Sequence, residues 1–137
     1  DKSQPYVEYA KSIGVFDNVE ILGYRNDISN LVALSDISLS SSRQEGLPIN
    51  LIEAMAIGNP IVATDVRGNN DLVKNGINGF TVPLNDSAAM ADAVMKRYNS
   101  PQLALDFKNQ NAKEVKKYSV ESVIDDMVGI YKDLLLL

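Results

Sequence analysis

The chain passes from a loop into a helix and then into a strand between residues 45 and 64. The run reads Glu45-Gly46-Leu47-Pro48-Ile49-Asn50-Leu51-Ile52-Glu53-Ala54-Met55-Ala56, then Ile57-Gly58-Asn59, then Pro60-Ile61-Val62-Ala63-Thr64. Pro48 suits the first turn of a helix, and Gly58 with Pro60 stops it. Because the helix is apolar nearly all round, we expect it to be buried between neighbouring elements. The apolar run after it is typical of a buried strand.

Similar short apolar runs recur on both sides of this segment. We predict strands at 19–23, 36–40, 60–64 and 79–82, and helices at 4–13, 28–34, 49–57, 87–98, 102–117 and 120–136. Alternating strands and helices predict an α/β fold, in which a Rossmann-like parallel sheet is flanked by helices. We interpret residues 1–137 as a single domain.

The composition removes several kinds of chemistry. The sequence contains neither cysteine nor histidine, which excludes disulfides, thiolate metal sites and Ser-His-Asp or Cys-His catalysis within the chain. It also lacks an Asp-x-Asp pair, the simplest carboxylate clamp for a metal–nucleotide complex. The formal net charge of −5 disfavours nonspecific binding to nucleic acid. No apolar run reaches transmembrane length and the start does not resemble a signal peptide, so we expect a cytoplasmic protein.

Arginines follow three of the predicted strands: Arg25, Arg43 and Arg67. Because the carboxyl ends of parallel strands meet at one edge of a sheet, we expect these side chains near that edge. Guanidinium groups there would suit an anionic ligand such as a diphosphate. The alternative is that arginine is simply common in loops.

Two glutamates flank the start of the central helix. Glu53 is the only charged residue in that helix, and a lone buried carboxylate is costly unless it is paired. It could accept hydrogen bonds from both hydroxyls of a ribose, or it could pair with a lysine or arginine of the core. Glu45 could be a solvated loop charge, a helix cap or a ligand for sugar hydroxyls. The amides at the start of the helix would suit a pyrophosphate.

A family resemblance emerges from several motifs in the order Ser42-Arg43-Gln44-Glu45-Gly46-Leu47-Pro48, Glu53-Ala54-Met55-Ala56, Gly58-Asn59-Pro60-Ile61-Val62-Ala63-Thr64, Gly68 and Asn75-Gly76-Ile77-Asn78-Gly79-Phe80. Together they resemble the family-4 retaining glycosyltransferases, and Glu45 and Glu53 stand at the spacing of that family's E-x7-E motif. The resemblance implies the C-terminal, donor-binding half of a GT-B fold. It also implies a nucleoside diphosphate sugar as substrate, with no metal and no other cofactor.

The resemblance also implies residue roles. Glu53 would bind the ribose hydroxyls, and Glu45 would hold hydroxyls of the donor sugar beside the reacting carbon. No protein nucleophile is assigned. The remaining predicted donor-site residues are Gly46, Leu47 and Ile49 through their backbone amides, Tyr24 and Arg25 beside the nucleobase, and Arg43 and Arg67 in the loops after the strands.

The family's domain normally begins with two further strands and a basic Arg/Lys pair, neither of which is found in this chain. We therefore expect an N-terminally truncated domain, with the 19–23 strand displaced, paired directly with 36–40 or completed by another molecule. Its expected partner is the missing N-terminal acceptor domain, without which the chain should be inactive. Exposed leucines at 134–137 predict a homo-oligomer of the fragment.

The expected process is bacterial surface polysaccharide synthesis, with the full-length protein associating peripherally with the inner face of the membrane. Two other functions share these features. One is a GT-B-fold nucleotide-sugar epimerase, although such enzymes usually depend on histidine. The other is a noncatalytic interaction module, which would tolerate loss of both glutamates.

Overall fold

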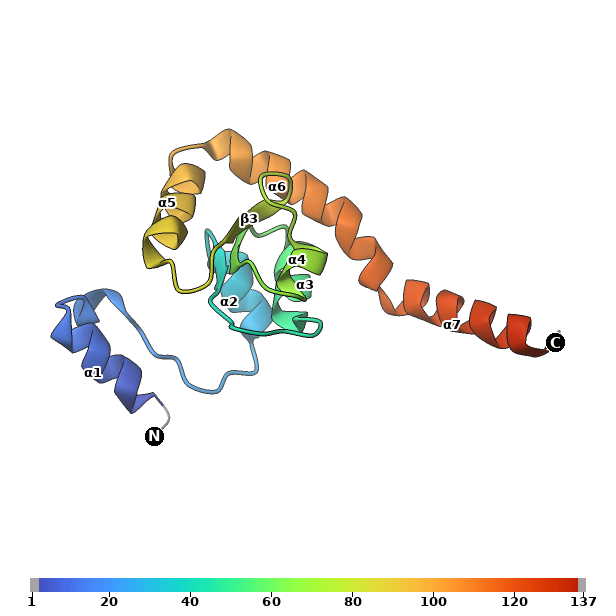
Figure 1. Cartoon of the computed structure of the whole chain (residues 1–137), viewed down its shortest axis with the longest axis horizontal. Helices are drawn as coiled ribbons and strands as arrows, with labels where there is room; N and C mark the ends of the chain where they lie inside the picture. Colours follow the sequence, from blue (N-terminus) through green and yellow to red (C-terminus); the bar gives the residue numbers. More distant parts are fainter. Residues whose placement is uncertain (1–2, 136–137) are drawn as a thin grey trace.

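The structure is a computed structural model that describes residues 3–135. Its helices are α1 (Gln4–Ser12), α2 (Ile28–Leu34), α3 (Ile49–Ile57), α4 (Asn69–Leu72), α5 (Ser87–Tyr98), α6 (Pro101–Glu114) and α7 (Val120–Leu135). The strands are β1 (Ser38–Ser40), β2 (Ile61–Thr64) and β3 (Gly79–Val82), and two 3-10 turns are η1 (Phe16–Asn18) and η2 (Val115–Tyr118). Helices surround the sheet, with α1 standing apart near the N-terminus (Figure 1).

The three strands form one parallel sheet in the order β1-β2-β3, as the alternation of strands and helices predicts. Ser38 of β1 lies opposite Ile61 of β2, which in turn lies opposite Gly79 of β3. All three strands therefore point the same way, and the loops that follow them leave the same edge of the sheet.

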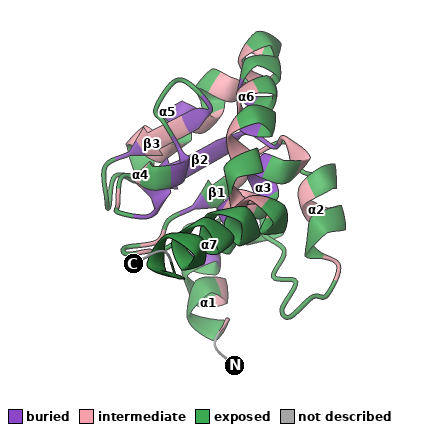
Figure 2. Cartoon of the chain, turned by 90° about the vertical axis from the view of Figure 1, so that its right-hand side faces the viewer, coloured by how far each residue is buried: buried purple, intermediate pink, exposed green. Residues whose placement is uncertain are grey.

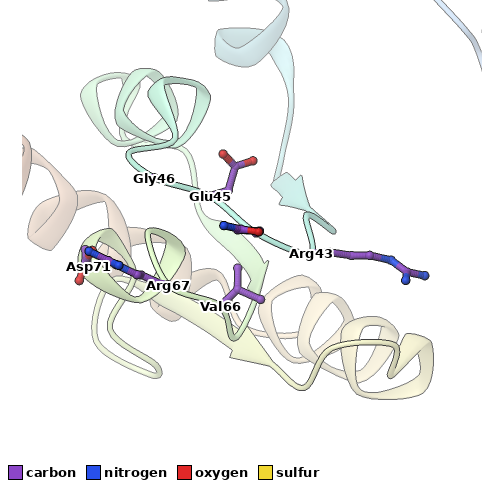
Figure 3. Close-up of a pocket in the computed structure, with 7 residues that line it drawn as sticks. Arg43, Glu45, Gly46, Val66, Arg67 and Asp71 are labelled. Carbon is purple, nitrogen blue, oxygen red and sulfur yellow. The ribbon is translucent and has the colours of Figure 1, made fainter.

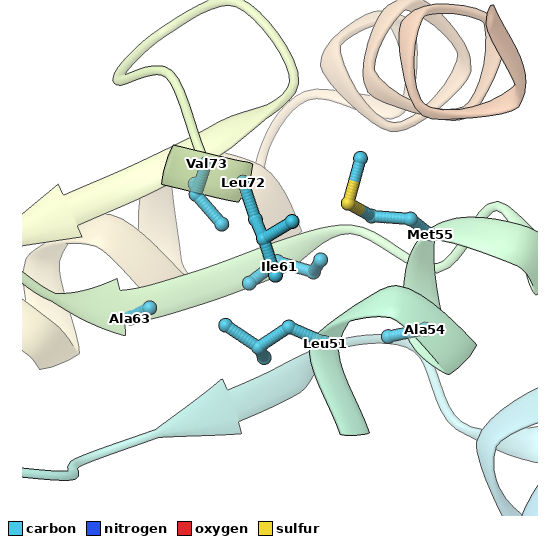
Figure 4. Packing of buried hydrophobic residues seen from close by; sticks show 7 residues of the cluster. All are labelled: Leu51, Ala54, Met55, Ile61, Ala63, Leu72 and Val73. Carbon is cyan, nitrogen blue, oxygen red and sulfur yellow. The ribbon is translucent and has the colours of Figure 1, made fainter. Parts of the chain in front are cut away.

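Alternate residues of the central strand β2 face opposite sides of the sheet. On one side, Ile61 and Ala63 join a buried cluster that also contains Leu51, Ala54 and Met55 of α3, together with Leu72 and Val73 (Figure 4). On the other side, Val62 packs with Val82 and with Ala93 of α5. This two-sided packing fixes α3 and α5 on opposite faces of β2 and so sets where α3 begins.

The predicted strand at 19–23 is wrong. These residues form no strand and are displaced from the sheet (Figure 1). The side chains of Val19, Ile21 and Leu22 are exposed. A strand is stabilised by its hydrogen-bonded neighbour. The other predicted strands pair with one another, but no described residue pairs with this segment, so its apolar pattern alone does not make it a strand.

The expected all-round burial of α3 is also wrong. Leu51, Ala54 and Met55 are buried, but Ile49 and Glu53 on the other side of the helix are exposed. The covered side of the helix packs on the sheet and on α2, α6 and η2, and the opposite side faces solvent. Its apolar composition indicated a buried helix without indicating that one side would have no neighbour among the described residues.

The closing helix α7 extends away from the sheet and carries an apolar stripe exposed along its length (Figures 1 and 2). The stripe consists of Val120, Val123, Ile124, Met127, Tyr131 and Leu134, each at least 46% exposed. Leu136 and Leu137, which contribute to the predicted leucine cluster, lie outside the described residues. No described helix is both long and apolar enough to cross a bilayer.

We predict that this stripe drives association of the chain with itself, because apolar side chains in contact leave water. Replacing Ile124 and Tyr131 together with glutamate should shift the mass measured by light scattering toward the monomer. Gly129→Glu, which adds a single glutamate on the opposite side of α7, is the control and should leave the mass unchanged. A wild-type chain that remains monomeric at high concentration would contradict the prediction.

Candidate functional site

The loops after β1 and β2 enclose a pocket of about 1090 Å³ at the carboxyl edge of the sheet (Figure 3). Its lining residues are Arg43, Gln44, Glu45, Gly46, Val66, Arg67 and Asp71. Four of the predicted site residues, Arg43, Glu45, Gly46 and Arg67, are therefore brought together. Residues from two separate loops meet here because β1 and β2 are parallel neighbours that end side by side.

Gly68 allows the two loops to touch. Its φ angle is +85°, and a Cβ atom at this position would lie 2.6 Å from the carbonyl oxygen of Gly46 and 2.8 Å from that of Glu45. Both contacts are with backbone atoms, which cannot swing aside. A side chain at residue 68 would therefore push the loop that carries Glu45 away from the loop after β2.

The Glu45 side chain is half-buried at the pocket and is held from within its own loop. The Ser42 hydroxyl donates a hydrogen bond to Glu45 Oε1 over 2.6 Å. The second carboxylate oxygen, Oε2, forms no hydrogen bond or ion pair with the described residues. Of the three roles that the sequence left open for Glu45, the helix cap is excluded, because no side chain caps the N-terminus of α3.

The start of α3 presents free backbone donors beside this loop. The cap residue Pro48 has no N–H, and the amides of Ile49 and Asn50 donate to no acceptor among residues 3–135. The amides of Gly46 and Leu47 likewise have no acceptor there. Unsatisfied amides at the positive end of a helix dipole favour an anionic group.

Two guanidinium groups contribute positive charge to the pocket. Arg43 and Arg67 extend in opposite directions from it (Figure 3), and neither forms an ion pair with a carboxylate of the described chain. Unpaired arginines in a protein of net charge −5 favour binding of an anion. Among residues 3–135, no group of acidic side chains is arranged to hold a metal ion.

Tyr24 and Arg25 do not lie in this pocket. Tyr24 is 96% exposed, and Arg25 donates two hydrogen bonds to the Asp27 carboxylate, over 2.8 and 2.5 Å. The Arg25 guanidinium lowers the pKa of Asp27 below its ordinary value, and the same hydrogen bonds raise the pKa of Arg25. Without a strand at 19–23, nothing anchors this turn at the carboxyl edge of the sheet.

Glu53 is exposed on α3 and forms no hydrogen bond or ion pair with the described residues. The expectation of a buried carboxylate is therefore wrong, and so is the alternative of a core ion pair. Glu53 does not line the pocket of Figure 3, nor do the side chains of Leu47 and Ile49, which are exposed. Its carboxylate is nevertheless free to bind a ligand.

Sequence reasoning missed Gln44, Val66 and Asp71 in the pocket lining, and treated Gly68 only as a turn residue. Val66 and Asp71 could have been found from the sequence, because residues 65–71 directly follow the strand predicted at 60–64. The loop after that strand leaves the same edge of the sheet as the loop that carries Glu45. Parallel pairing of the two strands would have placed both loops together.

Comparison with known proteins gives consistent matches. The family model described as "Glycosyl transferases group 1" matches residues 1–114. The putative glycosyltransferase EpsD of Bacillus subtilis (strain 168) is 34% identical over 126 residues, which cover 92% of this chain and 33% of EpsD. The UDP-Gal:alpha-D-GlcNAc-diphosphoundecaprenol alpha-1,3-galactosyltransferase of Escherichia coli is 30% identical over 93% of this chain and 33% of its own length.

Among solved structures, the crystal structure of Anabaena HepE in complex with UDP matches with a TM-score of 0.89 at 24% identity. The match covers 96% of this chain and 38% of HepE. The chain thus spans about a third of the length of the curated relatives it matches, 33% in both cases.

Proposed function

The chain belongs to the glycosyl transferases group 1 family and has the α/β fold found in GT-B enzymes; on that premise we propose that it is the donor-binding part of a retaining glycosyltransferase. The enzyme moves a sugar from a nucleoside diphosphate sugar to an acceptor, in the synthesis of a bacterial surface polysaccharide. The observation that carries the proposal is the meeting of the two loops at Gly68, which gathers Arg43, Glu45 and Arg67 around one pocket.

Relatives support the class of donor. HepE was crystallised with UDP, and the name of the Escherichia coli relative gives UDP-Gal as its donor. The same name gives a diphosphoundecaprenol-linked sugar as acceptor. A nucleoside diphosphate sugar suits a pocket that combines arginines with a carboxylate, since the diphosphate is anionic and sugar hydroxyls donate to carboxylates.

In this proposal each group has a separate task. The free amides of Gly46, Leu47, Ile49 and Asn50 and the two arginines stabilise the diphosphate as it departs, with no metal ion required. Glu45 accepts a hydrogen bond from a hydroxyl of the donor sugar. Glu53 accepts hydrogen bonds from the two hydroxyls of the ribose. The acceptor is brought by another part of the full-length protein.

The role of Glu53 is tested by Glu53→Gln, which keeps the shape of the side chain but removes its charge. We expect the variant to bind UDP more weakly, by about 1.5–3 kcal/mol, because a hydrogen bond to a charged group is lost. Binding of 2′,3′-dideoxy-UDP should change little, since that ligand lacks the diol. Both affinities can be measured by calorimetry.

Glu121→Gln is the matched control, because Glu121 is an exposed helical glutamate in the first turn of α7, outside the pocket. It should leave both affinities unchanged. If Glu53→Gln weakens UDP and its dideoxy analogue equally, Glu53 does not bind the ribose.

A further inference from the structure

A set of hydrogen bonds, buried at Asn69 and part-buried at Ser42, lies behind Glu45 between the ends of β1 and β2. Thr64, the last residue of β2, is 4% exposed, and Asn69, the first residue of α4, is 0% exposed. The Thr64 hydroxyl donates to the carbonyl oxygen of Ser42 over 2.5 Å. Ser42 then donates its own hydroxyl to Glu45 Oε1 over 2.6 Å. Ser42 thus links the buried end of β2 to Glu45 in the pocket by two hydrogen bonds.

The direction of these hydrogen bonds is determined by the Asn69 amide. Asn69 Nδ2 donates to the carbonyl oxygen of Thr64 over 3.0 Å and to its hydroxyl oxygen over 3.2 Å. The reverse orientation of the amide would set Asn69 Oδ1 against the Thr64 carbonyl oxygen, and two acceptors repel each other. With its oxygen accepting from Asn69, the Thr64 hydroxyl directs its single proton to Ser42.

The buried location strengthens the arrangement. Hydrogen bonds shielded from water are electrostatically stronger than exposed ones, and an unpaired buried donor or acceptor is costly. The carbonyl of Ser42 is therefore held in one place relative to β2. Since the Ser42 side chain grows from the same residue, its hydroxyl has a defined position from which to reach Glu45.

We propose that Thr64 and Asn69 are positioning residues for Glu45, which hold Ser42 so that the Glu45 carboxylate keeps one oxygen directed at the donor sugar. Neither side chain lines the pocket of Figure 3, and although Thr64 lines a second pocket that shares Arg43, its hydroxyl proton is donated to Ser42. The proposal rests on the proposed role of Glu45 in binding the sugar. It gives a role to Thr64 and Asn69, two buried polar residues. Packing of the sheet alone does not require polar side chains at these positions.

Thr64→Val tests this directly, because valine keeps the shape of threonine without its hydroxyl. Two measurements are made: amide hydrogen exchange over residues 42–47 without ligand, and the affinities for UDP-glucose and UDP. We expect faster exchange in that loop. The preference for UDP-glucose over UDP should fall about three- to tenfold, the usual effect of one hydrogen bond. Affinity for UDP itself should not change.

Two matched variants separate positioning from a general effect on the strand. Thr64→Ser keeps the hydroxyl and should restore both the exchange rates and the preference. Thr81→Val makes the same substitution in β3, where the threonine hydroxyl makes no hydrogen bond with the described residues, and should change neither.

A folded Thr64→Val protein with wild-type exchange and a wild-type preference would overturn the proposal. If Thr64→Val does not fold, Thr64→Ala decides, because it also removes the hydroxyl: an unchanged preference overturns the proposal, and a reduced preference that Thr64→Ser restores supports it. A wild-type chain that binds UDP-glucose no better than UDP would count against the sugar-binding role of Glu45. The exchange measurement would still decide whether Thr64 positions the loop.

Discussion

Residues 1–137 alone should transfer no sugar from any nucleotide sugar to any acceptor, with or without magnesium. Transfer with retention, without a protein nucleophile, depends on holding the donor and the acceptor face to face. Positioning of this kind supplies about 7–11 kcal/mol of the barrier. The described residues include the pocket that we propose for the donor but no second domain that could hold the acceptor. The resemblance also leads us to expect that the family's basic Arg/Lys pair is missing, which leaves stabilisation of the leaving diphosphate to Arg43, Arg67 and the free amides alone.

The experiment compares this chain with the same chain extended by the coding sequence that precedes Asp1 in its gene. Both are incubated with a panel of nucleotide sugars and acceptors, and transferred sugar is measured by mass spectrometry. We expect product only from the extended protein. Transfer by residues 1–137 alone would show that the donor half carries the whole reaction. Interconversion of the donor sugar without transfer would instead favour the epimerase, and no reaction by either protein would favour the interaction module.

Gly68→Ala should be the most damaging single substitution near the pocket. The φ angle of +85° strains any residue with a Cβ atom, at a cost of about 1–3 kcal/mol. The contact with the Gly46 carbonyl oxygen at 2.6 Å adds a steric cost of about 1–3 kcal/mol. We therefore expect the free energy of unfolding, measured by urea titration, to fall by about 2–6 kcal/mol.

Gly76→Ala is the control that separates strain from collision. Gly76 has a similar φ of +76°, but a Cβ atom there would meet nothing within 4 Å. Its substitution should therefore show only the strain, about 1–3 kcal/mol. Equal losses of stability in the two variants would mean that the loops after β1 and β2 do not need their close contact at Gly68.

Much of the candidate site could be predicted from the sequence because the position of a strand determines where its following loop lies. Glu45 and Arg67 are distant in sequence, yet both follow strands of one parallel sheet and so line one pocket. The E-x7-E spacing identified the family, which the family model confirms. The roles of Glu45 and Glu53 remain predictions, since neither fold nor family tests them.

The predictions that the structure contradicts have a common physical origin. Each depends on which other segment packs or pairs with the residues concerned, and the local sequence does not specify that segment. The apolar run at 19–23 resembles a strand, but no described residue pairs with it, and Tyr24 and Arg25 lie away from the pocket for the same reason. Glu53 was expected to be buried because α3 is apolar, although only one face of that helix is covered. The hydrogen bond from Thr64 to Ser42 behind Glu45 joins residues 22 positions apart, beyond the reach of spacing rules.

The central claim, that the loops after β1 and β2 bind a nucleotide sugar without metal, is tested most directly by an NMR titration. Isotope-labelled protein is titrated with UDP-glucose in the presence of EDTA, and the backbone amide signals are followed. Binding should be saturable, with the largest shifts at Gly46, Leu47, Ile49 and Gly68. No saturable shift under these conditions, or shifts confined to α1 or α7, would contradict the claim.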